Sequence, residues 1–188
     1  MNKEINDRLN PKGIVQIRHF DSKGNPKKLF DGNFLWEKIK KWTGLDLKIP
    51  LLLGSYRTII IKENLIVNVG LKRAADLLGG TNSATAMSAL AIGLSSTAPA
   101  AADTTLGNEI TSGGGSRGVA TVTNTTTTVT GDTEQFQKTW TFTASIAVAE
   151  EGIFDNNTSG GNMFAHNTFS TVNVVSGDSL QITHKIIA

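Results

Sequence analysis

The segment Glu134–Val148 constrains the fold more than any other, because its apolar and polar side chains alternate along its whole length. Gln and Thr side chains occupy most of the positions between the large apolar ones. Successive side chains of a strand point to opposite faces of a sheet. The segment therefore predicts a long antiparallel strand with one buried and one solvated face. The residues that share the apolar face are Phe136, Lys138, Trp140, Phe142, Ala144, Ile146 and Val148.

Other short segments have the same character. Ile14–Phe20 is predicted to be a strand, followed by turn-forming residues at Asp21–Pro26. Thr121–Thr130 is polar and β-prone, and Leu180, Ile182 and Ile186 repeat the alternation near the C-terminus. Strands at this spacing, separated by Gly- and Ser-containing turns, predict an antiparallel β-sandwich.

The region before Gly80 is richer in Lys, Leu and Ile, and its patterns are partly helical. Asn33 can cap a short helix that ends at Thr43 and packs through Leu35, Ile39 and Trp42. Tyr56–Val67 is expected to be β-rich. A second helix is expected over Leu71–Leu78, with Gly79 and Gly80 ending it. Its predicted apolar face consists of Leu71, Ala74, Ala75 and Leu78.

The composition changes near residue 80, and so we expect two parts. Residues 1–80 are predicted to form an N-terminal arm and a small α+β docking region with a hairpin and short helices. Residues 81–188 are predicted to form the antiparallel β-sandwich module. The fold class expected from the sequence is therefore mainly β.

Charge is distributed unevenly between the two parts. Residues 1–80 contain fifteen Lys and Arg against eight Asp and Glu, whereas residues 81–188 contain three against eight. The basic part is either a solvated face or a surface that docks on an acidic partner. No nucleic-acid-binding motif is present. Trp36 and Trp42 are either core residues or interface anchors. The candidate partner-interface residues are Lys27, Lys28, Trp36, Lys38, Lys41, Trp42 and Arg117.

Composition also argues against several classes of site. The chain has no Cys, which excludes disulfides and thiolate metal sites. Its three His alone argue against a structural zinc site. The first residues are polar and of mixed charge, without the apolar core of a signal peptide. The apolar runs near Ile49–Leu53 and Ala84–Leu94 are too short to span a membrane. We therefore expect a soluble protein that is made in a cytoplasm.

Two motifs imitate binding loops. Gly113–Gly118 matches G-x-G-x-x-G, but a strand is predicted after it where a dinucleotide site needs a helix. We expect a flexible loop in which Arg117 is a loop anchor or an interface residue. Asp155–Gly160 resembles the start of a calcium loop, but His166 stands where the closing Glu should be. An ordinary turn is the favoured interpretation.

The sequence gives no sign of catalysis. Glu150 and Glu151 are adjacent, so in a strand they point to opposite faces. One of them is expected to be partly buried and hydrogen-bonded to a turn. His19, His166 and His184 lie in separate strand-like segments. We expect no catalytic site, no cofactor and no metal.

The order of motifs in Ile66–Ile187 resembles a family of small virion proteins of tailed phages. The motifs are AIG at Ala91–Gly93, DTTLGNE at Asp103–Glu109, Arg117 before a Thr-rich strand, and GIFD, GGNM and GDSLQI in the last forty residues. Members of this family are described as tail-fibre-like, tail or head-decoration proteins. The resemblance implies a structural component of the virion, made in the host cytoplasm, and implies no enzyme.

Within this resemblance, the first hypothesis is a capsid decoration or cement protein, a homo-oligomer and most simply a trimer. Such a protein would bridge and stabilise subunits of the major capsid protein. A neck, tail or tail-fibre attachment role is the alternative within the virion, with neck or tail proteins as partners. A host-surface or carbohydrate-binding β-sandwich, with Thr111–Gly118 as the contact, is the alternative of another class.

Overall fold

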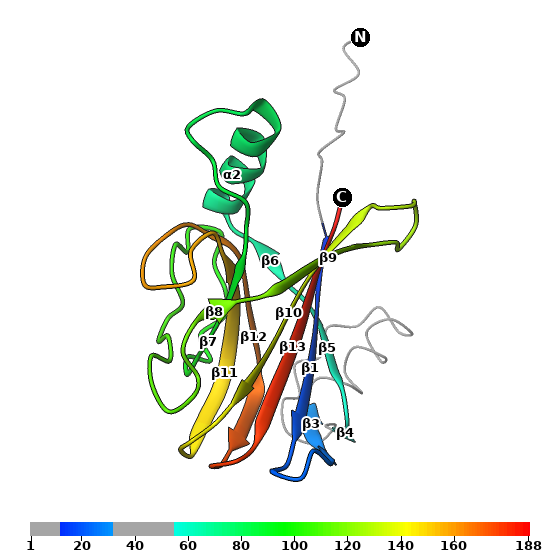
Figure 1. The fold of residues 1–188 in the computed structure, drawn as a ribbon, viewed down its shortest axis with the longest axis vertical. Helices are drawn as coiled ribbons and strands as arrows, with labels where there is room; N and C mark the ends of the chain where they lie inside the picture. Colours follow the sequence, from blue (N-terminus) through cyan, green and yellow to red (C-terminus); the bar gives the residue numbers. More distant parts are fainter. Residues whose placement is uncertain (1–11, 32–54) are drawn as a thin grey trace, which may run out of the picture.

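The computed structural model describes residues 12–31 and 55–188, and its main body is a sandwich of two antiparallel sheets (Figure 1). The helix predicted over residues 33–43 lies outside the described residues, together with the candidate interface residues Trp36, Lys38, Lys41 and Trp42.

The first sheet combines strands from both ends of the chain. Its order is β2-β1-β13-β10-β9, and β5 also pairs with β1. The strands are β1 (Lys12–Phe20), β2 (Pro26–Lys27), β5 (Ile60–Glu63), β9 (Thr121–Thr125), β10 (Thr133–Thr141) and β13 (Ser179–Ile187). β13 lies between β1 and β10 and is paired along its whole length with both.

The second sheet has the order β6-β12-β11-β7-β8 and faces the first. Its strands are β6 (Leu65–Ile66), β7 (Ala89–Gly93), β8 (Gly118–Val119), β11 (Ile146–Phe154) and β12 (Met163–Val174). A separate two-stranded sheet pairs β3 (Leu29–Asp31) with β4 (Ser55–Arg57).

The core lies between the two sheets. Alternate residues of each strand point inward, as the period-two pattern predicts. The first sheet contributes Val15, Ile17, Phe136, Trp140, Leu180 and Ile182, and the second contributes Leu90, Ile92, Val148, Ile153, Phe169 and Val172. The predicted mainly-β fold class is confirmed, with antiparallel pairing throughout the described strands.

The predicted single strand over Glu134–Val148 is wrong in one respect, because the structure divides it into β10 and β11, which belong to different sheets. The chain crosses between the sheets at residues 142–145. The amide of Phe142 donates to the carbonyl of Asp178 at 2.9 Å, and the amide of Thr143 donates to the carbonyl of Gly113 at 2.9 Å. β10 and β11 line the same core from opposite sides, but Ala144, which was predicted to lie on the buried face, is exposed because residues 142–145 belong to neither sheet.

The sandwich does not divide at residue 80. β1 and β5 are integral to the first sheet, and β6 pairs with β12 in the second. Val15 and Ile17 of β1 are fully buried in the common core. The described residues before Gly80 therefore complete the sandwich, because β13 and β12 would otherwise be left with unpaired edges.

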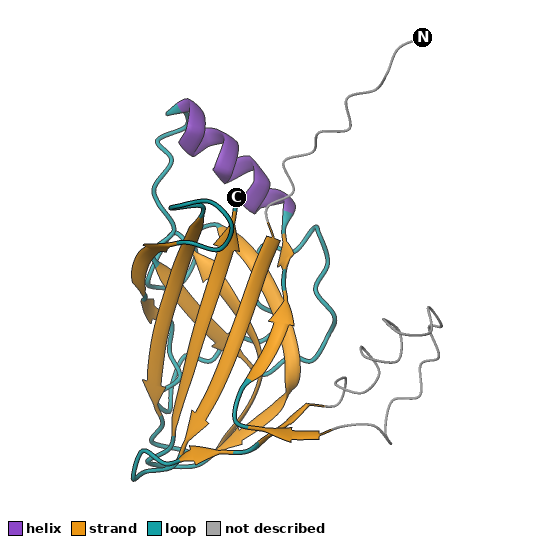
Figure 2. Ribbon diagram, turned by 90° about the vertical axis from the view of Figure 1, so that its right-hand side faces the viewer, coloured by secondary structure: helices purple, strands orange, loops and turns teal. Residues whose placement is uncertain are grey.

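The helix predicted over Leu71–Leu78 is α2 (Asn68–Gly79), and it stands at one end of the sandwich (Figure 2). Gly80 ends it in the left-handed conformation, with φ of 61°, as predicted. The predicted apolar face is wrong. Leu71 and Leu78 are 45% and 88% exposed, whereas the buried residues are Gly70, Arg73 and Asp76.

A close backbone contact and an ion pair determine which face of α2 is buried. Gly70 lies so near β12 that a Cβ atom would be 2.1 Å from the carbonyl oxygen of Phe164. Arg73 then reaches Asp155 at 2.8 Å. These contacts orient the helix more strongly than its leucines do.

A third layer covers the outer face of the second sheet. Residues 94–117, here named the cover loop, connect β7 to β8. Leu106 of this loop is buried in a small second cluster, which also contains Val67, Ala89, Ala91, Phe154 and Met163. This part of the outer face is therefore apolar and covered, which explains why β7 is buried on both sides.

Candidate functional site

Glu150 holds the cover loop to the second sheet. Its side chain is completely buried on the outer face of β11. Oε1 accepts hydrogen bonds from the amides of Ser95 at 3.1 Å and Asn108 at 2.8 Å, and Oε2 accepts one from the amide of Gly107 at 2.9 Å. One carboxylate thus binds both ends of the loop segment 95–108. Gly93 permits this approach, because a Cβ atom there would be 2.2 Å from Oε1.

His166 of β12 joins Glu150 to a second carboxylate. Its Nε2 lies 3.0 Å from Glu150 Oε2, and its Nδ1 lies 2.8 Å from Oδ2 of Asp103 in the cover loop. Only the imidazolium form carries an N–H on both ring nitrogens. The structure therefore favours a charged His166 between two ionised carboxylates.

The pKa values follow from these contacts. Burial lowers the pKa of His166, but the hydrogen bonds and charges of Glu150 and Asp103 outweigh burial and raise it above its usual value. Burial likewise raises the pKa of Glu150, but His166 and the three backbone amides lower it further, below its usual value. The amide of Ala100 lowers the pKa of Asp103. These directions agree with the contacts, because all three favour an imidazolium held between two ionised carboxylates.

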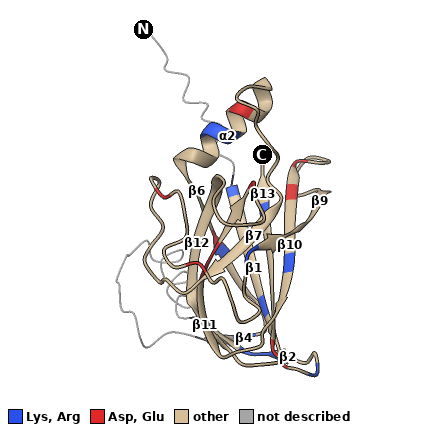
Figure 3. Cartoon of the chain, turned by 60° about the vertical axis from the view of Figure 1, so that its left-hand side comes forward, with Lys and Arg blue, Asp and Glu red and all other residues tan. Residues whose placement is uncertain are grey.

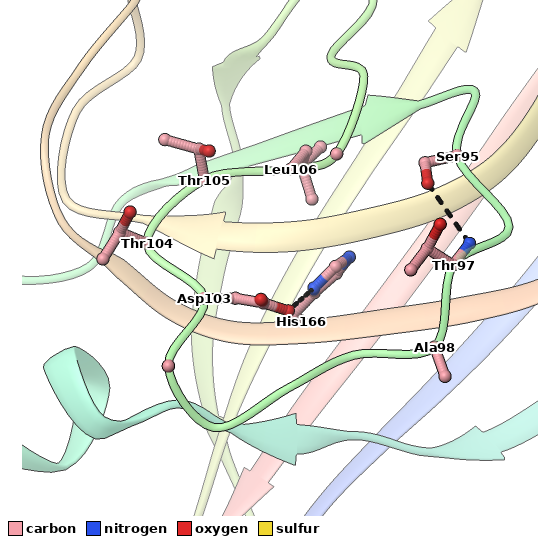
Figure 4. Close-up of a pocket in the computed structure, with 10 residues that line it drawn as sticks. Ser95, Thr97, Ala98, Asp103, Thr104, Thr105, Leu106 and His166 are labelled. Atoms are coloured by element: carbon pink, nitrogen blue, oxygen red, sulfur yellow. Dashed lines mark hydrogen bonds and ion pairs between the residues drawn. The ribbon is translucent and has the colours of Figure 1, made fainter.

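A pocket of about 350 Å³ opens beside this cluster (Figure 4). Asp103 and His166 both line it, and every lining residue except His166 belongs to the cover loop. The other lining residues are Ser95, Thr97, Ala98, Ala102, Thr104, Thr105, Leu106 and Gly107. Hydroxyl groups and one carboxylate can hydrogen-bond a small polar molecule. The lining contains no Phe, Tyr or Trp ring on which a sugar could stack.

The cluster is poorly arranged for catalysis. A histidine that activates a nucleophile needs one ring nitrogen free to accept its proton. Both ring nitrogens of His166 are bound to carboxylates. The Ser95 hydroxyl accepts a hydrogen bond from the Thr97 amide at 3.2 Å, within the same loop turn. The arrangement therefore stabilises a loop, which is the role expected for one of the two glutamates.

Glu151 points to the inner face of the same strand, as predicted for adjacent residues. It is also completely buried, so both glutamates are interior. Its Oε2 lies 3.1 Å from Nδ1 of His184 on β13. Asn64, between β5 and β6, lies 2.6 Å from Nε2 of the same ring. This network crosses the core and connects the two sheets.

His19 also contacts a buried carboxylate, as His166 and His184 do. His19 Nε2 lies 2.8 Å from Asp178 Oδ2, and Lys27 Nζ lies 2.9 Å from the same oxygen. Burial raises the pKa of Asp178, but Lys27, the Val175 amide and His19 lower it below its usual value. Lys27, a candidate interface residue, is thus engaged within the chain, although 38% of its side chain remains exposed. Lys28, another candidate, is exposed.

Arg117 is the loop anchor, one of its two predicted roles. Only 4% of its side chain is exposed. Its Nε donates to Glu109 at 2.8 Å, its Nη1 donates to the carbonyl of Gly160 at 2.6 Å, and its guanidinium lies 3.6 Å above the ring of Phe154. These contacts fasten the end of the cover loop to the turn after β11, and leave little surface for a partner.

The two motifs that imitate binding loops are structural. The first five residues of Gly113–Gly118 are loop and Gly118 begins β8, and Gly113 and Gly114 have φ of 64° and 85°. In the turn after β11, Asp155 is paired with Arg73 and accepts the amide of Asn162 at 2.7 Å. Its carboxylate is thus already bound within the protein, as the turn interpretation predicts.

Sequence reasoning missed Asp103, Asn64 and the pairing of carboxylates with histidines. Asp103 had a local signal, since its motif lies in a Gly- and Thr-rich turn, but no local signal points to His166. The charged residues of the described part are also scattered over its elements rather than gathered on one face (Figure 3). The Lys and Arg residues of β2, α2 and β10 lie well apart.

His166 makes the stability of the cover loop depend on pH. Because its pKa is raised on folding, protonated His166 contributes fully below its unfolded pKa, near 6.5. The contribution is lost as the pH rises through the higher folded pKa. We expect the difference in unfolding free energy between wild type and His166→Gln to shrink steadily above pH 6.5. Denaturant titrations from pH 6 to 9 measure it, and a difference independent of pH would contradict the assignment.

Comparison with known proteins finds a match between this chain and one family model. In residues 12–31 and 55–188, no helix has the length and apolarity of a membrane span. No curated protein and no solved structure matches the chain. A family model described as podophage GP4 fiber I protein gp80 matches residues 68–188, which include α2, the cover loop and every strand from β7 to β13. The chain therefore belongs to this family of structural proteins of tailed-phage virions.

Proposed function

We propose that the protein is a non-enzymatic structural subunit of a phage tail fibre or of its attachment to the tail. The family match carries this proposal, because the family is described by a fibre protein. It supports the tail or tail-fibre alternative over the capsid decoration role that was the first hypothesis from the sequence. The subunit would act by bridging other virion proteins, and neck or tail proteins are the proposed partners.

The absence of catalysis is part of the proposal. Its support is the state of the acid and base groups, since Glu150, His166 and Asp178 are all bound by two or more groups of the chain. Such groups stabilise the fold, and they could exchange a proton with a substrate only by breaking these hydrogen bonds and ion pairs. We also propose that the protein needs no cofactor or metal.

The number and location of copies on purified particles test this proposal. A fibre or tail component is expected at about three to twelve copies per particle, following the symmetry of the tail. Labelling with an antibody should place it on the tail in electron micrographs. Hundreds of copies, distributed over the head, would instead assign the decoration role and a contact with the major capsid protein.

We further propose that the protein is a homo-oligomer, and a trimer is the simplest form. Its support is the apolar surface that one chain leaves exposed on α2. Leu71, Leu77 and Leu78 are 45%, 41% and 88% exposed. An apolar pocket of about 320 Å³, lined by Ala74, Leu77, Val122, Phe136 and other residues, lies beside this helix. Exposed apolar patches of this kind are typical of protein interfaces.

We expect Leu78→Gln to raise the dissociation constant of the oligomer by about tenfold or more, because burying one Leu contributes about 1.5–3 kcal/mol. Val175→Gln is the matched control, since Val175 is 49% exposed but lies in the turn between β12 and β13. Analytical ultracentrifugation over a range of concentrations measures both. A monomeric wild-type protein, in solution and on the particle, would contradict the oligomer.

A further inference from the structure

Two buried polar side chains face the core from neighbouring strands of the second sheet. Glu151 of β11 and Asn167 of β12 are directly paired in the ladder. Their exposed fractions are 0% and 4%. Among the described residues, Glu151 Oε1 and Asn167 Nδ2 have no hydrogen-bond partner. Leaving such a group unpaired in the interior destabilises the fold, and more so for a charged group.

The chemistry of the two atoms is complementary. A carboxylate oxygen accepts hydrogen bonds and an amide nitrogen donates them. Side chains directly opposite each other in a ladder have Cβ atoms about 4.5–5.5 Å apart. A molecule between them must donate to Glu151 and accept from Asn167. Water does both, whereas a cation would be repelled by the amide hydrogens.

We propose that a buried water molecule binds between Glu151 Oε1 and Asn167 Nδ2 as a permanent part of the core. Buried waters in proteins typically make about three hydrogen bonds to groups that otherwise lack partners. The ladder is irregular beside this pair. The register of β11 and β12 shifts between Val148 and Glu150, so the strands deviate from regular pairing close to Glu151.

The water extends a network that already crosses the core. Glu151 Oε2 is bound to His184 of β13, and His184 is bound to Asn64 before β6. With the water, the network connects Asn167 of β12 to the first sheet through Glu151 and His184. Glu151 and His184 already link the two sheets, and the water extends this link to Asn167 of β12. It supplies partners to two buried atoms of the network that otherwise lack them.

Two measurements on the full-length protein test the proposal. A crystal structure at high resolution should show a density peak about 2.7–3.2 Å from both Glu151 Oε1 and Asn167 Nδ2. In solution, magnetisation transfer in NMR should show a long-lived water beside the side-chain amide of Asn167. A direct Asn167–Glu151 hydrogen bond, or another protein group in this position, would overturn the proposal. So would a peak ringed by oxygen ligands at about 2.3–2.6 Å, because those distances indicate a bound cation.

A pair of variants tests whether the bound water depends on the side chain of Asn167. In the wild type the same water should also give a signal at the backbone amides of residues 151 and 167. Asn167→Leu removes the side-chain donor, and this backbone signal should then be lost. Asn173→Leu is the matched control, because Asn173 lies on the same strand but is exposed, and the signal should remain. Persistence of the signal in folded Asn167→Leu would overturn the assignment of Asn167. If that variant does not fold, the two measurements on the wild-type protein decide the question alone.

Discussion

Replacing Glu150 by Ala is expected to lower the free energy of unfolding by about 3–5 kcal/mol, and to release the cover loop. The substitution leaves the amides of Ser95, Gly107 and Asn108 without their acceptor, and it leaves the His166 imidazolium with one carboxylate instead of two. Denaturant unfolding measures the loss of stability. Hydrogen exchange at the three amides measures the release of the loop, and their protection should disappear.

Glu134→Ala is the matched control for this experiment. Glu134 is an exposed carboxylate on β10 that accepts one hydrogen bond from Asn124. Its removal should change stability by no more than about 0.5 kcal/mol, as is usual for surface substitutions. If the three amides stay protected in a folded Glu150→Ala protein, the cover loop is held mainly by Leu106 and its apolar neighbours rather than by the carboxylate.

Trp140→Ala should be similarly severe, with a loss of about 3–5 kcal/mol. Trp140 is 2% exposed in the centre of the core. Its indole N–H donates to the carbonyl of Ser116 at 2.8 Å, so it also fastens the end of the cover loop. A typical domain has only about 5–15 kcal/mol of stability in total. The variant should therefore unfold at a much lower denaturant concentration.

Two further variants separate the contribution of apolar burial at Trp140 from that of its indole hydrogen bond. Trp140→Phe retains much of the apolar contact but loses the indole donor, which should cost about 1 kcal/mol for the hydrogen bond, in addition to the smaller volume. Thr139→Ala changes the neighbouring exposed residue and should have little effect. Equal losses for Thr139→Ala and Trp140→Ala would show that the outer face of β10 matters as much as its inner face.

Local patterns in the sequence predicted the elements that depend on neighbouring residues. The turn after β1 forms because Asp21 accepts the amides of Lys23 and Asn25, both within four residues of it. Gly80 ends α2 because a glycine enters the left-handed region without steric cost. The alternation of residues 134–148 correctly predicted the burial of Phe136, Trp140, Phe142 and Val148, but not the exposure of Ala144. These predictions succeeded because the interactions concerned, or the periodicity they leave, lie within one short segment.

The pattern could not assign strands to sheets. Period-two alternation is the same whether β10 and β11 form one strand or cross between two sheets. The crossing depends on the carbonyls of Asp178 and Gly113, which are distant in the sequence. The prediction of the apolar face of α2 was wrong for a similar reason. The contact of Gly70 with Phe164 and the ion pair of Arg73 with Asp155 fixed its orientation, and neither partner belongs to the helix.

The candidate site shows the same division. From the sequence alone, adjacent glutamates in a strand had to point to opposite faces, and one was expected to hold a turn. Their partners came only from the tertiary structure, which places His166 beside Glu150 and His184 beside Glu151. Arg117 likewise acquired its role from Glu109 and the turn after β11. The sequence by itself determined the period and the turns, because backbone geometry imposes them locally. Only the tertiary structure decided which buried charges meet, because such pairing depends on sheet order and on the burial that removes competing water.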